Sequence, residues 1–275
     1  MLCKDKITAI FCIIDDILKE INHKEDKRRK VSDSEVVITA LIAAQSFYGN
    51  HSSAIKFVKY FGLISNMLDK SRFNRRLHKL GGILFEIFEF ISSYFKEICC
   101  EMEYIIDSFP VKICKNIRIS RSKIVKGKQW RGYTASMKSY FYGIKVQLIT
   151  TKRGVPFAFH FTAGKVADVK ALNKILDKFS PESSLYGDSA YTAYDLEDEF
   201  LEKYGVFLKT QRKKNCKKPD SKEDIKKKTQ MRKRIEVTIS DIKKMFPKKI
   251  HAVTLAGFLL KVTMYIFSNQ VNSIT

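Results

Sequence analysis

Three acidic residues, Asp107, Asp188 and Glu236, lie where carboxylates can do chemistry. The first two each close a short apolar segment that reads as a buried strand, and the third lies on a predicted helix inside a basic block. Such strand ends are where open α/β sheets place their sites. Carboxylate oxygens suit Mg²⁺ and Mn²⁺, and two such ions about 3.5–4 Å apart can activate an attacking oxygen and stabilise a leaving oxygen at a phosphodiester. The three residues therefore predict a metal-dependent site that cleaves phosphodiesters.

Two basic residues share the predicted helical face of Glu236. Arg232 precedes it by four residues and Lys243 follows it by seven, and both spacings return to the same side of a helix. We expect these two cations to hold the phosphate and to stabilise the charge that develops during cleavage.

Each acidic residue also has a purely structural interpretation. Asp107, which a serine and a proline follow closely, could be a turn residue. Asp188 could cap the helix that follows it, and Glu236 could be only the ion-pair partner of Arg232. The basic surroundings of the three favour the metal-binding interpretation.

Basic residues outnumber acidic ones by 51 to 29, which gives a formal net charge of +22. The excess is concentrated in two blocks, with 12 basic and 3 acidic residues over 101–160 and 17 and 5 over 205–250. Codon bias toward lysine would also favour glutamate, so it does not explain the imbalance. A polyanionic partner, nucleic acid or an anionic membrane surface, is expected, and a hydrophobic content of 45% excludes wholesale disorder.

The sequence shows no signal peptide and no segment apolar enough to span a bilayer. Its six cysteines include no C-x-x-C pair and no common zinc spacing, which predicts reduced thiols. We expect a soluble protein of the cytoplasm without a membrane partner.

Hydrophobic periodicity predicts two domains. Residues 1–100 read as helices only, at 7–21, 32–48, 53–61, 71–80 and 83–98, and Ser32 with Glu35 is predicted to form a capping box at the start of the second. Residues 101–275 mix strands, at 104–107, 140–150, 155–161, 184–188 and 206–208, with helices at 168–179, 193–204, 230–245 and 254–267. A lysine-rich connector, 211–228, separates the last strand from the next helix. The predicted fold class is α/β, with a helical domain in front.

The helix that Ser71 is expected to cap carries candidate DNA-binding residues on its first turns: Arg72, Asn74, Arg75 and Arg76. Arginine and asparagine read guanine and adenine edges with paired hydrogen bonds. A preceding short helix makes this a candidate recognition helix of a helix-turn-helix. A solvated basic face is the alternative.

Trp130 and Arg131 form a second candidate DNA contact. Trp130 is the single tryptophan and stands among cations, where an aromatic ring can stack on an unpaired base. The alternative is a loop aromatic that folds back onto the core.

Several stretches resemble bacterial insertion-sequence transposases of the DDE type, and among these the nine-eighty-two family of insertion sequences. The stretches are 71–78 (SRFNRRLH), 106–111 (IDSFPV), 142–146 (YGIKV), 186–191 (YGDSAY), 232–236 (RKRIE) and 246–254 (FPKKIHAVT). The similarity covers nearly the whole chain. Two positions depart from the pattern of the relatives: Thr229 replaces a signature tyrosine, and Gln147 stands where relatives often carry histidine.

The resemblance implies a ribonuclease-H-like domain whose mixed five-stranded sheet has the order 3-2-1-4-5, with helices on both faces. Asp107 and Asp188 would end adjacent central strands, and Glu236 would project from the helix after the fifth strand. The three carboxylates would hold Mg²⁺ or Mn²⁺, and two ions are expected. Arg232, Glu236 and Lys243 match three of the four residues of the Tyr-Arg-Glu-Lys signature of related transposases.

The implied function is transposition: recognition of the element's terminal inverted repeats, metal-dependent strand cleavage, and attack of the freed 3′-hydroxyl on target DNA. A homodimer on double-stranded DNA is expected because two ends must meet, and the bacterial nucleoid is the expected location. Two alternatives remain. One is a basic DNA-binding protein without chemistry, such as a repressor or a decayed transposase copy. The other is a ribonuclease-H-like nuclease that cleaves strands but never joins them.

Overall fold

The end of the chain belongs with the helices of its beginning. Contacts group Met1–Ser93 with Asp241–Thr275 in one unit and place Tyr94–Ser240 in a second. The sequence instead predicts a boundary at residue 100 with everything after it in the sheet domain. The structure differs because α9 (Leu255–Asn272) packs against α2 (Asp33–Ser46).

The computed structural model describes residues 3–135, 137–172, 178–212 and 219–274. Part of the predicted basic connector, with Lys213 and Cys216, lies outside these residues, as does part of the helix expected over 168–179. No helix in the described ranges combines the length and the apolar character needed to cross a membrane.

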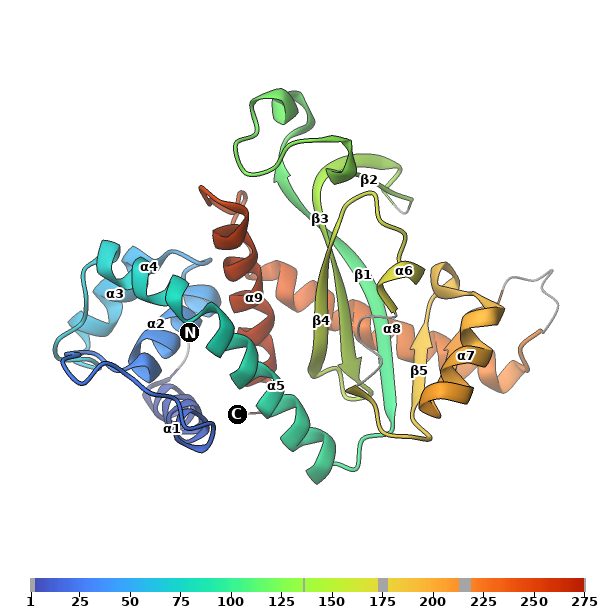
Figure 1. The fold of residues 1–275 in the computed structure, drawn as a ribbon, viewed down its shortest axis with the longest axis horizontal. Coiled ribbons are helices and arrows are strands. Elements are labelled where there is room, and N and C mark those ends of the chain that lie inside the picture. The colour runs from blue at the N-terminus through green and yellow to red at the C-terminus, as the bar shows by residue number, and fades with distance from the viewer. Residues whose placement is uncertain (1–2, 136, 173–177, 213–218, 275) are drawn as a thin grey trace. The chain divides into compact units, whose positions relative to one another are not determined.

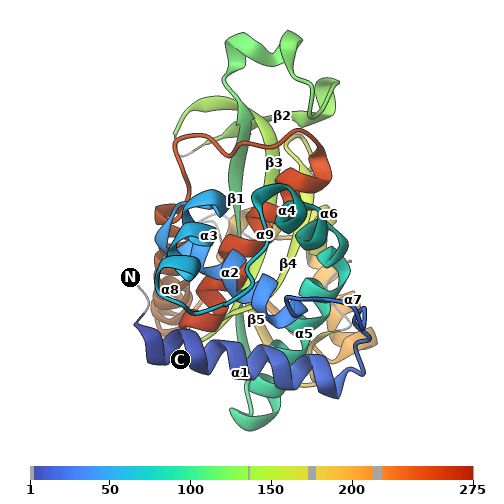
Figure 2. The same cartoon turned by 90° about the vertical axis from the view of Figure 1, so that its left-hand side faces the viewer.

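α2 lies at the centre of the helical unit. Nearly all of its side chains are buried, because α2 contacts α1 (Lys4–Glu20), α3 (His51–Tyr60), α4 (Lys70–Lys79) and α9 (Figure 2). α5 (Gly81–Ile98) begins in this unit, and its Phe88 ring meets Phe267 of α9 edge-on, with ring centroids 6.2 Å apart. α2 is apolar on nearly all sides, and such a helix is stable only when other helices surround it, as they do here.

The helix caps confirm one prediction and correct another. The predicted capping box is present: Ser32 Oγ accepts the Glu35 N–H at 3.0 Å, and Glu35 Oε2 accepts the Ser32 N–H at 2.7 Å. Ser71, the predicted cap of α4, lies inside that helix, and Asp69 caps it by accepting two backbone N–H groups at 2.9 Å. Residues 61–69 separate α3 from α4, a longer connection than the three- or four-residue turn of a helix-turn-helix.

The second unit is built on one mixed sheet. Its six strands in the described residues are β1 (Glu103–Cys114), β2 (Arg131–Thr134), β3 (Ser139–Thr151), β4 (Pro156–Ala163), β5 (Ser184–Gly187) and β6 (Phe207–Thr210). β3 is antiparallel to β1, β2 and β4, whereas β5 lies between β1 and β6 and is parallel to both. The prediction of five strands misses β2, which pairs with the start of β3 while β4 pairs with the remainder.

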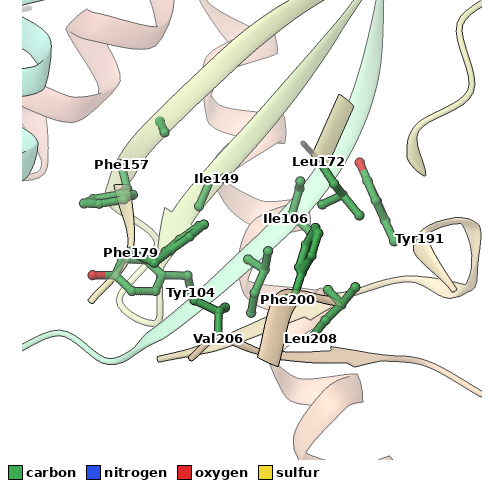
Figure 3. Packing of buried hydrophobic residues seen from close by; sticks show 12 residues of the cluster. Tyr104, Ile106, Ile149, Phe157, Leu172, Phe179, Tyr191, Phe200, Val206 and Leu208 are labelled. Atoms are coloured by element: carbon green, nitrogen blue, oxygen red, sulfur yellow. The ribbon is translucent and has the colours of Figure 1, made fainter. Parts of the chain in front are cut away.

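One face of the sheet carries a hydrophobic core. Tyr104 and Ile106 of β1 and Leu208 of β6 pack there with Phe200, as Figure 3 shows, and Leu185 of β5 belongs to the same cluster. Phe200 belongs to α7 (Tyr194–Tyr204), and the short α6 (Val169–Leu172) adds Leu172 to the same cluster. Because strand residues alternate between faces, Glu103 and Asp107 of β1 point to the opposite face.

α8 (Lys222–Lys244) covers that opposite face. Lys227 of α8 forms an ion pair with Glu103, and Figure 1 shows the helix passing behind the sheet while α7 lies in front. The helix is longer than the predicted 230–245, because it begins inside the stretch expected to be a connector. α8 starts in the second unit, and its last turn belongs to the first.

A basic finger, residues 115–138, leaves the sheet between β1 and β3. It contains two short 3₁₀ turns, Asn116–Arg121 and Lys128–Trp130, followed by β2, and Figure 1 shows it extending beyond the strands. No acidic residue occurs anywhere in the sequence from 108 to 167. The finger therefore carries only positive charge.

Candidate active site

Asp107 lies inside a strand. The sequence predicts that its strand ends there, but β1 continues to Cys114, because the antiparallel ladder with β3 continues and pairs Asp107 with Leu148. What ends near Asp107 is the parallel ladder with β5, whose last pair is Ile105 with Tyr186. Asp107 therefore lies where the pairing of β1 with β5 ends, while the pairing of β1 with β3 continues past it.

The parallel register places Asp107 and Asp188 side by side. Glu103 pairs with Ser184 and Ile105 with Tyr186, so each β5 position exceeds its β1 partner by 184 − 103 = 81. Asp188 follows Asp107 by 188 − 107 = 81 and continues this register just beyond the last residue of β5. Neighbouring strands lie about 5 Å apart, so the two carboxylates emerge next to each other.

Asp188 caps a turn as well as facing Asp107. Its Oδ1 accepts the N–H of Ala190 at 2.8 Å, which starts the 3₁₀ turn Ser189–Tyr191. The structural interpretation of this residue as a cap is therefore correct, and it leaves Asp188 at the sheet edge. One carboxylate can do both, because the cap uses a single oxygen.

Glu236 lies on α8 at the border of the side that packs on the sheet. Met231, Ile235 and Ile239 of α8 are buried, while Arg232 and Glu236, each one position further on, are half-exposed. Arg232 Nε donates to Glu236 Oε1 at 2.9 Å, as the ion-pair interpretation predicts. The Arg232 guanidinium also donates to Gln211 at 3.3 Å, and the Gln211 N–H is bonded to Gly187, next to Asp188.

The charges of Asp188 and Glu236 act on the carboxyl of Asp107. Burial raises the pKa of Asp107 to about 6; the Ser108 N–H opposes this, and the negative charges of Asp188 and Glu236 add to it. Arg232 lowers the pKa of the same carboxyl. Three hard oxygen donors that repel one another suit a divalent cation, which relieves the repulsion.

The three carboxylates do not form a closed cluster. Within the described ranges, the acid and histidine groups whose ligand atoms all lie within 4.8 Å of one another are His23, Glu25 and Asp33. Asp33 has His23 Nε2 at 2.8 Å and the Arg76 Nε donor at 2.7 Å, which makes this a buried ion-pair network already neutralised by arginine. A metal ion shared by Asp107, Asp188 and Glu236 would require the three side chains to draw together.

A buried polar network supports the turn of Asp188. Tyr191 donates to Gln147 Oε1 at 2.5 Å, and the Gln147 amide donates to Asp168 Oδ1 at 2.7 Å. Lys145 Nζ donates to the same Asp168 oxygen at 2.7 Å. Asp168, the residue before α6, is thus a mostly buried acceptor of two side chains. Only the departure at Gln147 marks this network in the sequence.

The last lysines of the predicted connector 211–228 make specific contacts. Lys227 pairs with Glu103, and the buried Lys228 ammonium donates to the Thr210 carbonyl at 2.9 Å and to Asp220. They fix α8 to β1 and β6 instead of presenting free charge. Lys243, seven residues after Glu236, has an exposed side chain on the last turn of α8.

The candidate DNA-binding residues of α4 face different ways. Arg72 is exposed beside Asp69, and Arg75 is exposed as well. Arg76 is turned into the protein, where it binds Asp33, and the Asn74 Oδ1 lies 2.6 Å from His51 Nδ1. Two of the four predicted base-reading residues are thus engaged inside the helical unit.

The finger offers a broader aromatic surface than the sequence indicates. Trp130 is half-buried and Arg131 exposed. Tyr133 and Tyr140 form a cross-strand pair, with ring centroids 4.9 Å apart and exposed fractions of 52% and 70%. They border a groove of about 680 Å³ that Arg131, Lys145 and Lys165 also line. The alternating pattern around Tyr133 and Tyr140 is the signal that could have identified this pair.

Comparison with known proteins identifies the region that holds the three carboxylates. Residues 97–252, more than half of the chain, match the family model described as a transposase DDE domain. No curated protein matches the chain. A solved structure to which it is similar is the Mos1 mariner paired end complex with Mn, at 12% identity and a TM-score of 0.22, over 86% of this chain and 88% of that chain.

Proposed function

The chain belongs to the family of transposase DDE domains, and from this premise we propose that it is a DNA transposase whose active site consists of Asp107, Asp188 and Glu236. The observation that carries the proposal is the shared register of Asp107 and Asp188, with the charge of Glu236 acting on the same carboxyl. All three residues lie inside the matched range. We assign the chain to the nine-eighty-two family of insertion sequences and its sheet to the ribonuclease-H-like class on the same residues.

The three carboxylates would hold Mg²⁺ or Mn²⁺, with two ions proposed. When bound, such ions activate the attacking oxygen and stabilise the leaving oxygen of the phosphodiester. Water attacks phosphorus at the element end, the bond to the 3′ oxygen breaks, and a 3′-hydroxyl and a 5′-phosphate result. That hydroxyl then attacks a phosphodiester of target DNA, so one bond forms as another breaks.

Arg232 orients the phosphate in this scheme. Its guanidinium donates to Glu236 and Gln211, and its charge lowers the pKa of Asp107, so it acts on two of the three carboxylates. A fixed cation there stabilises the negative charge that grows on the phosphate oxygens. Lys243 is proposed as a second phosphate contact on its helical spacing alone.

DNA is the proposed partner. The proposed exposed contacts are Arg72 and Arg75 of α4 and Arg131 of the finger, next to the half-buried Trp130. Asn74 and Arg76 are assigned to support α4. Two element ends must be joined, so we propose a homodimer on double-stranded DNA, located in the bacterial nucleoid.

Cleavage of a duplex that carries the inverted repeats flanking the reading frame tests the proposal. With Mg²⁺ or Mn²⁺ the wild type should nick the end and transfer it to a target plasmid, while Asp188→Asn should lose about 10²-fold or more. Asp198→Asn, an exposed acid on α7, is the matched control and should cleave normally. Calorimetry with Mn²⁺ and no DNA should show weakened binding only for Asp188→Asn.

The rivals give different results in the same assay. Cleavage without strand transfer identifies a nuclease. Tight binding without cleavage in either metal identifies a DNA-binding protein or an inactive copy. Equal Mn²⁺ affinity for the wild type and Asp188→Asn would remove the carboxylates from the metal site.

A further inference from the structure

The helical unit contains a cavity of about 1020 Å³ that the proposed chemistry does not use. Its walls are the start of α3, one side of α4, the start of α9 and the segment 247–254 that precedes α9. That segment is most of the 246–254 motif, for which the active site offers no role. All of these elements belong to one unit.

The lining is strongly cationic. It includes Lys70, Arg75, Lys79, Lys249 and Lys261, and three histidines, His51, His78 and His251, while no carboxylate lines it in the described part of the chain. A protein surface normally intersperses the two signs of charge. A cavity that gathers this many cations without an acid is complementary to an anion with several charges.

The cations already disfavour one another's charge. Burial lowers the pKa of Lys261, and the charge of Lys70 lowers it further. Burial likewise lowers the pKa of His51; a hydrogen bond to Asn74 opposes this, and Lys261, His78 and Lys70 add to the lowering. An anion in the cavity would relieve this repulsion.

The walls are held in place by specific contacts. The Lys261 ammonium donates to the His251 carbonyl at 2.7 Å and so ties the 247–254 segment to α9. His51 meets the Phe73 ring edge-on, with centroids 5.2 Å apart. A Cβ placed on Gly257 would lie 3.0 Å from His78 Cε1, so the small residue lets the imidazole lie against α9. The cavity is a fixed feature of the unit.

We propose that this cavity binds the phosphate backbone of duplex DNA, so that α4 contacts DNA through charge and not by reading bases. The inference rests on the proposed function and deepens it. Five lysine and arginine side chains exceed what a single phosphate needs, and a row of phosphates supplies several charges at once. Asn74 and Arg76 are engaged within the protein, which leaves α4 with Arg72 and Arg75 as its exposed arginines.

The test compares two double variants of equal charge. Lys70→Gln/Lys249→Gln removes two lining cations, and Lys56→Gln/Lys248→Gln removes two exposed lysines outside the lining. The affinity of the full chain for a duplex is measured by anisotropy between 50 and 200 mM salt, with the element end and with unrelated sequence. Each lost phosphate contact lowers the slope of log affinity against log salt by about 0.9.

We expect the slope to fall by about 1–2 for Lys70→Gln/Lys249→Gln, equally on both sequences, and to stay within about 0.3 of the wild type for the control. Equal slopes for the two variants would overturn the proposal. So would a loss confined to the element end, which would mean base reading. A calorimetric titration with inorganic phosphate that fills the cavity while both variants keep wild-type DNA binding would assign it to a free anion.

The outcome is separable from that of the proposed function. Binding is measured without metal, so it stands whether or not the wild type cleaves. Conversely, the control Lys56→Gln/Lys248→Gln should nick DNA at the wild-type rate, because neither residue lines the cavity or belongs to the carboxylate site. Normal thermal unfolding of both double variants shows that the unit is intact.

Discussion

The hydroxyl of Tyr191 donates to the fully buried Gln147 side chain at 2.5 Å, and so fastens the turn that begins at Asp188 to the centre of β3. Asp188 is only three residues away in the chain. The position of one proposed metal ligand therefore depends on a hydrogen bond between two uncharged side chains.

Removing that bond should separate positioning from binding. Tyr191→Phe leaves Gln147 Oε1 without its donor, which should lower the free energy of unfolding by about 1–3 kcal/mol. We also expect slower cleavage at saturating DNA with an unchanged Kd, measured well below the melting temperature. Tyr204→Phe, a partly exposed tyrosine of α7, is the control. A loss of stability with an unchanged cleavage rate would show that Tyr191 is structural only.

Arg232→Ala should slow cleavage of saturating DNA by about 10²-fold or more, because a transition-state donor is lost. Lys233→Ala removes an exposed cation from the next position of α8 and should leave the rate unchanged. Single-turnover cleavage measures both. If Arg232→Ala cleaves as fast as the wild type, Arg232 is only the ion-pair partner of Glu236.

The ion pair between Glu103 and Lys227 of α8 should make the free energy of unfolding depend on pH in the acidic range. Burial alone would raise the pKa of Glu103, but hydrogen bonds from Lys152, Lys227 and Tyr186 outweigh it and lower the pKa to about 2. The unfolded chain then binds the proton more tightly, so this stabilisation is present above pH 4.5 and is lost as the pH falls toward 2. Glu103→Gln should cost on the order of 2 kcal/mol at neutral pH and flatten this part of the curve.

Glu101→Gln is the matched control for that experiment. Burial raises the pKa of Glu101, so its charge destabilises the fold and its removal should not weaken it. Urea unfolding of the three proteins between pH 2.5 and 7 provides the comparison. Parallel curves for the wild type and Glu103→Gln would contradict the assigned role.

Tyr133 of the finger and Tyr140 of β3, the exposed tyrosine pair, should bind DNA by stacking on its bases. Tyr140→Ala should weaken binding to DNA with an unpaired segment by about 1–3 kcal/mol, the contribution of one stacked base, whereas Tyr140→Phe should retain it. Both are measured by anisotropy on single-stranded and duplex probes. Equal weakening in the two variants would mean that the hydroxyl, not the ring, makes the contact.

Adjacent arginines of α4 should behave in opposite ways. Arg76→Ala leaves the buried Asp33 carboxylate without the guanidinium that pairs with it. The free energy of unfolding should fall by about 1–3 kcal/mol, and the melting temperature should fall with it. Arg75→Ala should unfold as the wild type does and weaken DNA binding uniformly across sequences. A melting curve and a binding curve for each variant are sufficient. If Arg76→Ala were as stable as the wild type, the structural role assigned to Arg76 would be wrong, and Arg76 would again be a candidate DNA contact.

Local patterns predict most elements of the fold, because capping and periodicity act within a few residues. The capping box at Ser32 and the β3–β4 hairpin were predictable for this reason. The spacing of 81 residues between Asp107 and Asp188 equals the offset at which β1 and β5 pair in the sheet. What failed depends on partners far along the chain: the continuation of β1 past Asp107, and the packing of α9 on α2.

The candidate site shows the same division. Residue type, position at a strand end and helical spacing together point to the three carboxylates and Arg232. The roles of Asp168 and Arg76 could not be predicted, because each is decided by a distant buried partner, Gln147 for one and Asp33 for the other. A charged residue in a helical pattern looks identical whether it faces solvent or a buried counter-charge.

The division of the helical unit between two distant stretches of chain sets the order in which this protein can mature on the ribosome. α2 and its neighbours emerge first, yet the helix that covers α2, α9, is made only after the whole sheet has been synthesised. Until then the apolar surface of α2 lacks its cover, and segments in that state aggregate or await chaperones. A message cut short before α9 would therefore yield helices whose apolar surface has no cover, and this fragment would not be stable.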